Sequence, residues 1–209
     1  MGRVNAADLD GVTIDAYGTL VSLVDPIPAL TAALSERGVE RDHETVVHGF
    51  RTEVAHYTQH SASGHDAAGL ATLQQDCASV FLDAVGADLD AAEFAPVYAS
   101  AMHFEVLPGV VTALARLRSL GLSLAVVANW DLTLRRLLDE IGLTQYFQVV
   151  VHAARKPAPD GLLRALAELQ IDPARALHIG DDEVDELAAR AAGMRYAKTP
   201  LADAVALIA

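Results

Sequence analysis

Short apolar runs, each closed by a polar cluster, alternate with longer amphipathic segments along most of the chain. Four of these runs are too short for helices and predict buried parallel strands. They cover residues 11–16, 122–128, 148–152 and 176–180, and a weaker fifth run covers residues 194–197. Strands that alternate with amphipathic helices are typical of βαβ crossovers. The pattern therefore predicts an α/β fold with a doubly wound parallel sheet.

One connection is far longer than a crossover helix requires, because the first predicted strand ends near residue 16 and the second begins near residue 122. Apolar positions at helical spacing predict four helices in this interval. They cover residues 27–38, 47–57, 66–85 and 91–102. We therefore expect residues 22–106 to form an inserted all-helical cap. Residues 1–21 and 107–209 are expected to form the α/β core, in which residues 107–121 are the delayed crossover helix.

The charge balance excludes two classes of partner. The 209 residues carry 28 Asp and Glu against 15 Lys and Arg, for a formal net charge of -13. Nucleic acids and anionic membranes bind through clustered Lys and Arg, so we expect neither as a partner. No long uninterrupted apolar stretch or signal-peptide pattern is present, and Cys77 is the single cysteine. These features predict a cytoplasmic protein, with the oligomeric state left open.

Polar residues follow each of the four predicted strands. They are Asp15, Tyr17, Gly18 and Thr19 after the first strand, Asn129 after the second, Lys156 after the third, and Asp181, Asp182 and Asp185 after the fourth. In an open parallel sheet, ligands bind outside the carboxyl ends of the strands. We therefore expect a nucleophile candidate, a small polar group, a cation and an acidic cluster at one edge of the sheet. Carboxylates this close together need a cation, or they raise one another's pKa.

These motifs, in this order, resemble those of the haloacid dehalogenase-like hydrolase superfamily, in the branch whose helical cap lies between the first two motifs. The matching stretches are DAYGTL at 15–20, VVANWD at 126–131, RKP at 155–157, and GDDEVDELAARAAGM from Gly180. The resemblance covers roughly residues 10–200. It implies a hydrolase with a Rossmann-like core and an aspartyl nucleophile.

The resemblance to the phosphatases of this superfamily implies a role for several residues. Asp15 is expected to attack phosphorus and form an aspartyl phosphate. A Mg2+ cofactor is expected to be held by Asp15, the backbone carbonyl of Tyr17, and Asp181. Lys156 is expected to steady the phosphoryl oxygens and the nucleophile. This ligand set suits a hard cation that neutralises charge on a phosphoryl group.

Four further residues are expected around these. Asp185 lies four residues after Asp181, on the same helical face, and is expected to orient the metal's waters or Lys156. Asp182 is expected mainly to cap the helix that follows. Thr19 is expected either to donate a hydrogen bond to a phosphoryl oxygen or only to finish the turn. Asn129 is expected to contact the substrate.

Two positions depart from the phosphatase pattern. Tyr17 stands where the phosphatases carry a second Asp that protonates the leaving group and then activates water, and a phenol is a poor base near neutral pH. Ala128 stands where they usually carry Ser or Thr. DAYGT also resembles the first motif of the 2-haloacid dehalogenases, in which Arg51 would match the arginine that binds the departing halide. The acids at 181 and 182 instead favour a cation and phosphoryl chemistry.

The leading hypothesis is a Mg2+-dependent phosphatase of a small anionic phosphomonoester. The alternatives are a metal-free 2-haloacid dehalogenase and a catalytically weak relative that binds phosphate or a protein. Outside the motifs, His56 and His60 form a pair at helical spacing that fits either a zinc site or a solvated face, with the solvated face favoured. His178 is predicted to be a packed strand residue.

Overall fold

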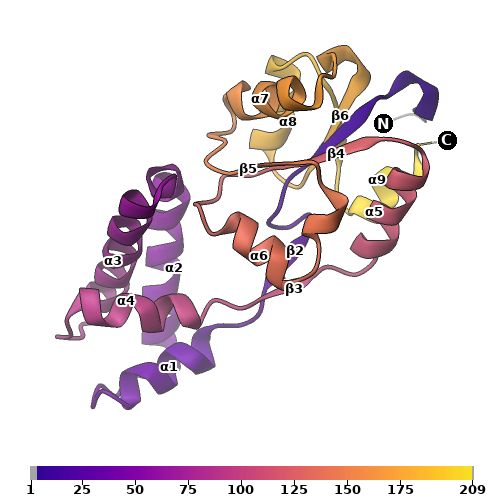
Figure 1. Ribbon diagram of the computed structural model, residues 1–209. Coiled ribbons are helices and arrows are strands. Elements are labelled where there is room, and N and C mark those ends of the chain that lie inside the picture. Colours follow the sequence, from indigo (N-terminus) through magenta and orange to yellow (C-terminus); the bar gives the residue numbers. More distant parts are fainter. Residues whose placement is uncertain (1–3, 209) are drawn as a thin grey trace. The chain divides into compact units, whose positions relative to one another are not determined.

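The computed structural model describes residues 4–208, and its centre is a five-stranded parallel sheet (Figure 1). The strand order is β5-β4-β1-β6-β7. The strands are β1 (Gly11–Ile14), β4 (Ser123–Val127), β5 (Val149–Val151), β6 (Ala176–Gly180) and β7 (Arg195–Lys198). The predicted α/β class with a doubly wound parallel sheet is confirmed.

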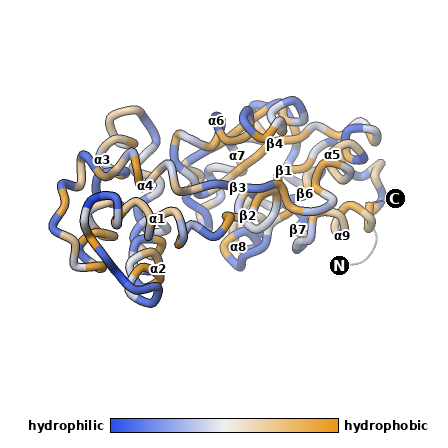
Figure 2. The backbone as a smooth tube through the Cα atoms, turned by 90° about the horizontal axis from the view of Figure 1, so that it is seen from below, coloured by the Kyte–Doolittle hydropathy of each residue, from blue (hydrophilic) through white to orange (hydrophobic). Residues whose placement is uncertain are grey.

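Helices cover both faces of the sheet, so its central strands consist of buried residues. α7 (Asp160–Leu169) and α8 (Glu183–Ala191) lie on one side, and α5 (Val110–Ser119) and α9 (Leu201–Ala206) lie on the other (Figure 1). Every residue of β1 and β6 is buried. Figure 2 shows the hydrophobic colouring along these central strands. A sheet buried on both faces requires continuous apolar runs, which is the pattern in the sequence.

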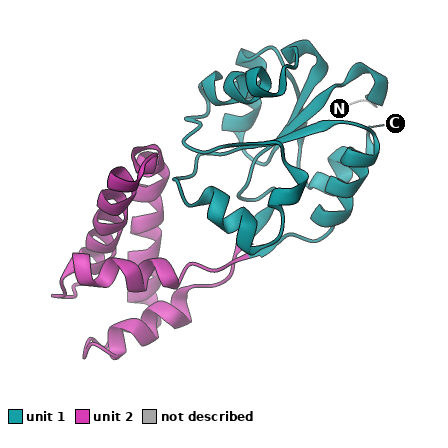
Figure 3. Ribbon diagram, in the orientation of Figure 1, with its two compact units in different colours: residues 1–22, 105–209 teal, residues 23–104 magenta. Residues whose placement is uncertain are grey.

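The chain divides into two compact units (Figure 3). One unit holds the sheet and includes the described residues up to Ser22 and from Glu105 onward; the other is Leu23–Phe104. Residues 1–3 and 209, which the expected core boundaries include, lie outside the described residues. The role of the second unit as a cap stays a prediction. Within the described residues, no helix combines the length and the apolar character needed to cross a membrane.

The second unit consists of α1 (Ile27–Ser35), α2 (His43–His60), α3 (Ala67–Ala84) and α4 (Ala91–Ser100). Its core includes Leu30, Leu34, Phe81 and Phe94. Three of the four helices begin at an Asp whose side chain accepts a hydrogen bond from the first turn; these residues are Asp42, Asp66 and Asp90. Such caps bind otherwise unpaired backbone N–H groups, which explains why the helices begin there.

Two short strands that the hydrophobic pattern did not predict connect the units. β2 (Val21–Leu23) and β3 (Phe104–Val106) pair in a two-stranded ribbon. Three residues are too few to show alternation, so neither strand has a signal in the sequence. The crossover helix predicted over 107–121 is also shorter, because α5 begins only after Gly109, whose φ of 80° is outside the helical region.

A carboxyl group is buried in the helical unit. Glu53 on α2 is 5% exposed, and its Oε2 accepts a hydrogen bond from the Tyr98 hydroxyl at 2.7 Å. Burial raises the pKa of Glu53 above its usual value, although hydrogen bonds from Tyr98 and Cys77 act in the opposite direction. The folded unit therefore favours the protonated form of this acid.

We expect Glu53→Gln to stabilise the protein at neutral pH. A carboxyl group whose pKa is raised by folding stabilises the fold when protonated, and this contribution is lost as pH rises above the unfolded value. Melting temperatures should therefore agree near pH 4 and separate by pH 7, with the variant higher. Tyr98→Phe is the control and should be less stable than the wild type by about 1–3 kcal/mol, since it leaves the carboxyl short of a donor. A wild type that melts above Glu53→Gln at pH 7 would contradict the prediction.

Candidate active site

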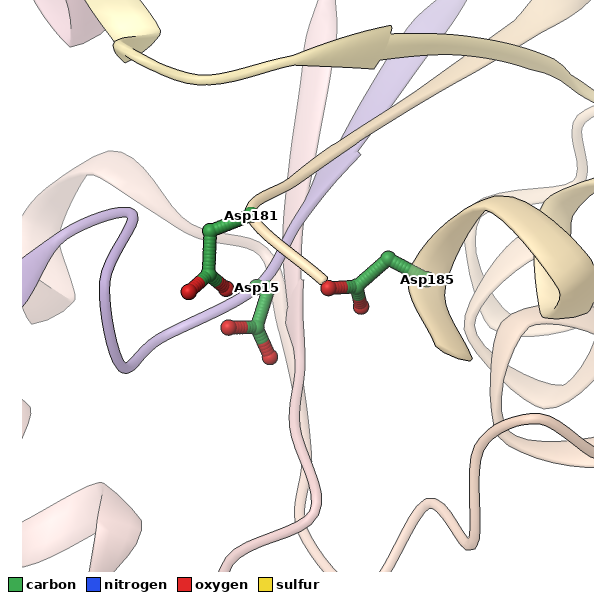
Figure 4. Close-up of side chains that lie close together, drawn as sticks. All are labelled: Asp15, Asp181 and Asp185. Carbon is green, nitrogen blue, oxygen red and sulfur yellow. The ribbon is translucent and has the colours of Figure 1, made fainter. Parts of the chain in front are cut away.

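Three carboxylates meet at the carboxyl edge of the sheet. Asp15 directly follows β1, Asp181 follows the neighbouring strand β6, and Asp185 lies in the first turn of α8. One oxygen from each lies within 4.8 Å of the others (Figure 4). Because β1 and β6 pair in parallel, their ends bring residues more than 160 positions apart in sequence to the same place.

Lys156 lies between two of these carboxylates. Its ammonium donates to Asp15 Oδ1 at 2.5 Å and to Asp185 Oδ1, and the residue is 6% exposed. A buried ammonium is tolerated only when paired, so this bridge fixes both the nucleophile candidate and the second acid.

The loop that carries Lys156 is tied to the end of β4 by Asn129. The Asn129 side chain accepts from the backbone N–H of Lys156 at 2.8 Å and donates to its carbonyl at 2.9 Å. Both hydrogen bonds are made to the backbone, so Asn129 places the lysine. Its expected contact with substrate remains a prediction.

Beneath the carboxylates lie two buried residues with no solvent exposure, Thr13 on β1 and His178 on β6. His178 Nε2 lies 3.1 Å from Asp185 Oδ1, and its Nδ1 lies 2.8 Å from the Thr13 hydroxyl. The sequence pattern predicts His178 only as a packed strand residue. The signal available there was a polar ring inside a strand otherwise made of apolar residues, two positions before Gly180.

The environment separates the pKa values of the two acids that flank Lys156. Burial raises the pKa of Asp15 to about 6, against the attraction of the lysine charge. Burial also disfavours ionised Asp185, but the hydrogen bond from His178 and the charge of Lys156 outweigh it and lower this pKa to about 2. Burial and the charge of Asp185 raise the pKa of Asp181. Asp185 is therefore a fixed negative charge, whereas Asp15 and Asp181 gain from a nearby cation.

The turn after Asp15 holds residues of very different exposure. The Tyr17 side chain is 53% exposed, whereas Thr19 is 1% exposed and its hydroxyl has no hydrogen-bond partner among the described residues. Gly18 has a φ of 71°, and a Cβ there would lie 2.2 Å from an Asp181 oxygen. Gly18 therefore lets the turn pass directly against Asp181.

The remaining predicted residues lie in different places. Asp182 is the N-cap of α8, as predicted, and its backbone N–H donates to Asp185 Oδ2 at 3.2 Å. Arg51 is exposed on α2 of the helical unit. His56 and His60 stack on the same helix with their ring centroids 4.2 Å apart. Among the described residues, these two histidines belong to no group of three or more side chains that could hold a metal.

The three-carboxylate cluster fits a hard divalent cation. Carboxylate oxygens are the preferred ligands of Mg2+, which binds through one or two carboxylates and keeps several waters. Both Asp185 oxygens already accept hydrogen bonds from Lys156, His178 or Asp182, which leaves the Asp15 and Asp181 carboxylates as the better placed ligands. The unpartnered Thr19 hydroxyl also suits a site that receives a polar ligand.

Comparison with known proteins identifies relatives over most of the chain. The family model described as haloacid dehalogenase-like hydrolase matches residues 9–193. Phosphoglycolate phosphatase 1 of Pseudomonas aeruginosa is 31% identical over 200 residues, which cover 93% of this chain and 68% of that protein. The phosphoglycolate phosphatase of Rhodobacter capsulatus is 34% identical over 144 residues, which cover 63% of each. The matches thus span about two thirds of the length of these relatives.

The fold is also similar to that of an enzyme with different chemistry. L-2-haloacid dehalogenase from Xanthobacter autotrophicus, with chloropropionic acid covalently bound, aligns with a TM-score of 0.66 at 22% identity. The alignment covers 91% of this chain and 77% of that one. At this identity the likeness concerns the fold, so the reaction has to be argued from the site.

We expect Gly18→Ala to weaken binding of a divalent cation, because its Cβ would displace the Asp181 carboxylate. Gly142→Ala is the matched control: Gly142 has a φ of 72°, and a Cβ there would meet nothing within 4 Å. Both variants should lose about 1 kcal/mol of stability from the positive φ. Titration calorimetry with Mg2+ should show weaker binding only in Gly18→Ala. Equal affinity in the two variants would show that Asp181 is not held by this turn.

Proposed function

Because this chain belongs to the haloacid dehalogenase-like hydrolase family, we propose that it is a phosphatase that uses Mg2+ to hydrolyse a small phosphomonoester. The observation that carries the proposal is the set of Asp15, Asp181 and Lys156 at one edge of the sheet. A nucleophile, an acid free to bind a cation, and a buried ammonium are the groups that phosphoryl transfer requires.

The charge of the site supports phosphoryl chemistry with a cation over metal-free dehalogenation. Three carboxylates against one ammonium leave two negative charges when all the groups are ionised. An anionic substrate would be repelled by this centre, and a divalent cation would balance it. Both 2-haloacids and phosphomonoesters are anions, so a metal-free reaction would need a less acidic site than this one.

In the proposed reaction, an Asp15 carboxylate oxygen attacks phosphorus. A bond forms between this oxygen and phosphorus while the bond from phosphorus to the leaving oxygen breaks, which leaves an aspartyl phosphate. Water then attacks the phosphorus of this acyl phosphate, and the bond from phosphorus to the Asp15 oxygen breaks, which releases phosphate and restores the carboxylate. The Lys156 contact at 2.5 Å holds Asp15 in a single orientation for the attack.

Each remaining group has a defined part in this proposal. Asp15, the Tyr17 carbonyl and Asp181 would hold Mg2+, which neutralises the charge that develops on the phosphoryl oxygens. The Lys156 ammonium and the Thr19 hydroxyl would donate to phosphoryl oxygens. Asp182 would cap α8, and Asp185 would hold Lys156 in place.

The identity of residue 17 constrains the substrate. A phenol such as the exposed Tyr17 side chain is a weaker general acid than the carboxyl group that the phosphatases carry at this position, so proton donation to an alkoxide leaving group should be less effective. Phosphate esters with good leaving groups, which need no proton, should therefore react best. Phosphoglycolate is the first alkyl phosphate to test because relatives of this chain carry that name.

We also propose the cytoplasm as the compartment and a cap role for the helical unit. A single cysteine among 209 residues fits a reducing compartment. The net charge of -13 is unfavourable for binding nucleic acid. If the helical unit is a cap, its residues, Arg51 among them, would select the substrate.

The proposal predicts that the purified protein hydrolyses p-nitrophenyl phosphate or phosphoglycolate with added Mg2+. EDTA should abolish turnover, and Asp15→Asn should reduce it to background because the amide cannot act as the nucleophile. The same screen should include 2-chloropropionate with and without Mg2+. Chloride release that EDTA does not affect would contradict the proposal and show that the protein is a metal-free dehalogenase. Binding of Mg2+ or phosphate without turnover of any compound would identify a non-catalytic relative.

We expect Tyr17→Asp to raise the rate with alkyl phosphates much more than with aryl phosphates. A carboxyl group at this position can protonate an alkoxide, and general acid catalysis typically contributes about 100-fold or more. The ratio of kcat for phosphoglycolate to kcat for p-nitrophenyl phosphate measures this effect directly. Tyr17→Asn is the control, because an amide of the same size donates no proton. If this ratio rises equally in both variants, the smaller side chain and not proton donation causes the change.

A further inference from the structure

His178 lies on the buried strand β6 and contacts the proposed catalytic centre through Asp185. The ring is fully buried, and its Nε2 lies 3.1 Å from Asp185 Oδ1. That same oxygen accepts from the Lys156 ammonium, which also holds Asp15. His178 therefore reaches the nucleophile through two intermediate side chains.

The partners of the ring determine where its proton lies. Asp185 Oδ1 already accepts a hydrogen bond from Lys156, and a carboxylate offers only lone pairs, so Nε2 must carry the hydrogen and donate. On the other side, Nδ1 lies 2.8 Å from the Thr13 hydroxyl and 3.1 Å from the Thr13 carbonyl. The hydroxyl can donate to a bare Nδ1, whereas the carbonyl can only accept from a protonated one.

Asp185 thus sets the tautomer of the ring, and the Thr13 hydroxyl supports it by donating to the bare Nδ1. When the Thr13 hydroxyl donates to Nδ1, the hydrogen is on Nε2 and faces Asp185. Without the hydroxyl, the remaining neighbour of Nδ1 is the Thr13 carbonyl, which cannot donate to a bare nitrogen, so the ring loses one of its two restraints while Nε2 still donates to Asp185. Thr13 and His178 are register partners in the pairing of β1 with β6, so the sheet itself sets their distance.

We propose that His178 is a positioning residue for this site, supported by the Thr13 hydroxyl in the Nε2–H tautomer so that it fixes Asp185 and, through it, Lys156. The inference rests on the proposed phosphatase function for its effect on rate. Its tautomer and its contacts are independent of that function. Residues that orient the groups in direct contact with a reaction centre commonly change activity by about 10–100-fold when replaced.

The first test is spectroscopic and requires no substrate. In protein with 15N-labelled histidine, we expect His178 to give the nitrogen shifts of the Nε2–H tautomer. Thr13→Val keeps the β-branched shape and removes the hydroxyl, and it should shift the Nδ1 resonance toward that of a nitrogen that accepts no hydrogen bond. Thr13→Ser should retain the wild-type spectrum. An Nδ1–H or doubly protonated ring in the wild type, or an unchanged spectrum in Thr13→Val, would overturn the assignment.

The second test measures kcat and KM with p-nitrophenyl phosphate and Mg2+. Thr13→Val should lower kcat about tenfold with KM changed less than about threefold, as expected for a group that acts by positioning. Thr144→Val is the matched control: the Thr144 hydroxyl is also buried but has no hydrogen-bond partner among the described residues, and this variant should leave kcat unchanged. Equal kcat in Thr13→Val and the wild type would overturn the positioning role.

Replacing the histidine itself distinguishes positioning from packing. The amide nitrogen of His178→Gln reaches the place of Nε2 and should preserve most of the activity. The amide of His178→Asn corresponds to Nδ1, cannot reach Asp185, and should lower kcat by at least tenfold. If both variants lose kcat equally and have the same melting temperature, His178 acts only through packing. If the wild type turns over no phosphomonoester, the proposed function fails, and the tautomer measurement alone decides whether Thr13 and His178 are arranged as inferred.

Discussion

The buried bridge of Lys156 to Asp15 and Asp185 is the interaction on which the candidate site depends. A buried ammonium is stable only beside negative charge, and each carboxylate is stable there only beside the ammonium. The bridge joins three chain segments that are far apart in the sequence: the end of β1, the loop after β5, and the first turn of α8. Removing Lys156 would leave both buried carboxylates without their shared ammonium, so the lysine holds the two sides of the site together.

This bridge explains why the three acids of the site differ from one another. Asp185 is committed to hydrogen bonds from Lys156, His178 and the backbone N–H of Asp182, so it stays ionised and immobile. Asp15 shares the lysine, but its burial disfavours the charged form. Asp181 lies against Gly18 and is only partly buried. One acid thus serves as a fixed anchor, and the other two gain most from a cation, which is the division of roles that a metal-dependent nucleophile needs.

Of the two positions that depart from the phosphatase pattern, Tyr17 lies on the exposed side of the site and Ala128 is buried. Tyr17 is exposed, whereas the groups that orient the nucleophile are buried beneath it. In the proposed reaction, phosphoryl transfer to Asp15 and proton transfer to the leaving group would therefore depend on separate parts of the structure. Residue 17 belongs to the second part, so the proposal makes leaving-group dependence the property most sensitive to this residue.

The sequence by itself determined the fold class and the members of the site. Apolar runs identify the strands of a buried parallel sheet, and the residues after them identify Asp15, Lys156 and Asp181, because parallel strands bring their carboxyl ends to one edge. Periodicity carried no information on β2 and β3, since three residues are too few to show a period. Only the tertiary structure decided the role of Thr13 and His178. A short apolar run predicts that a side chain within it is enclosed, but the hydrogen-bond partner of an enclosed polar ring depends on which strand lies beside it and in what register.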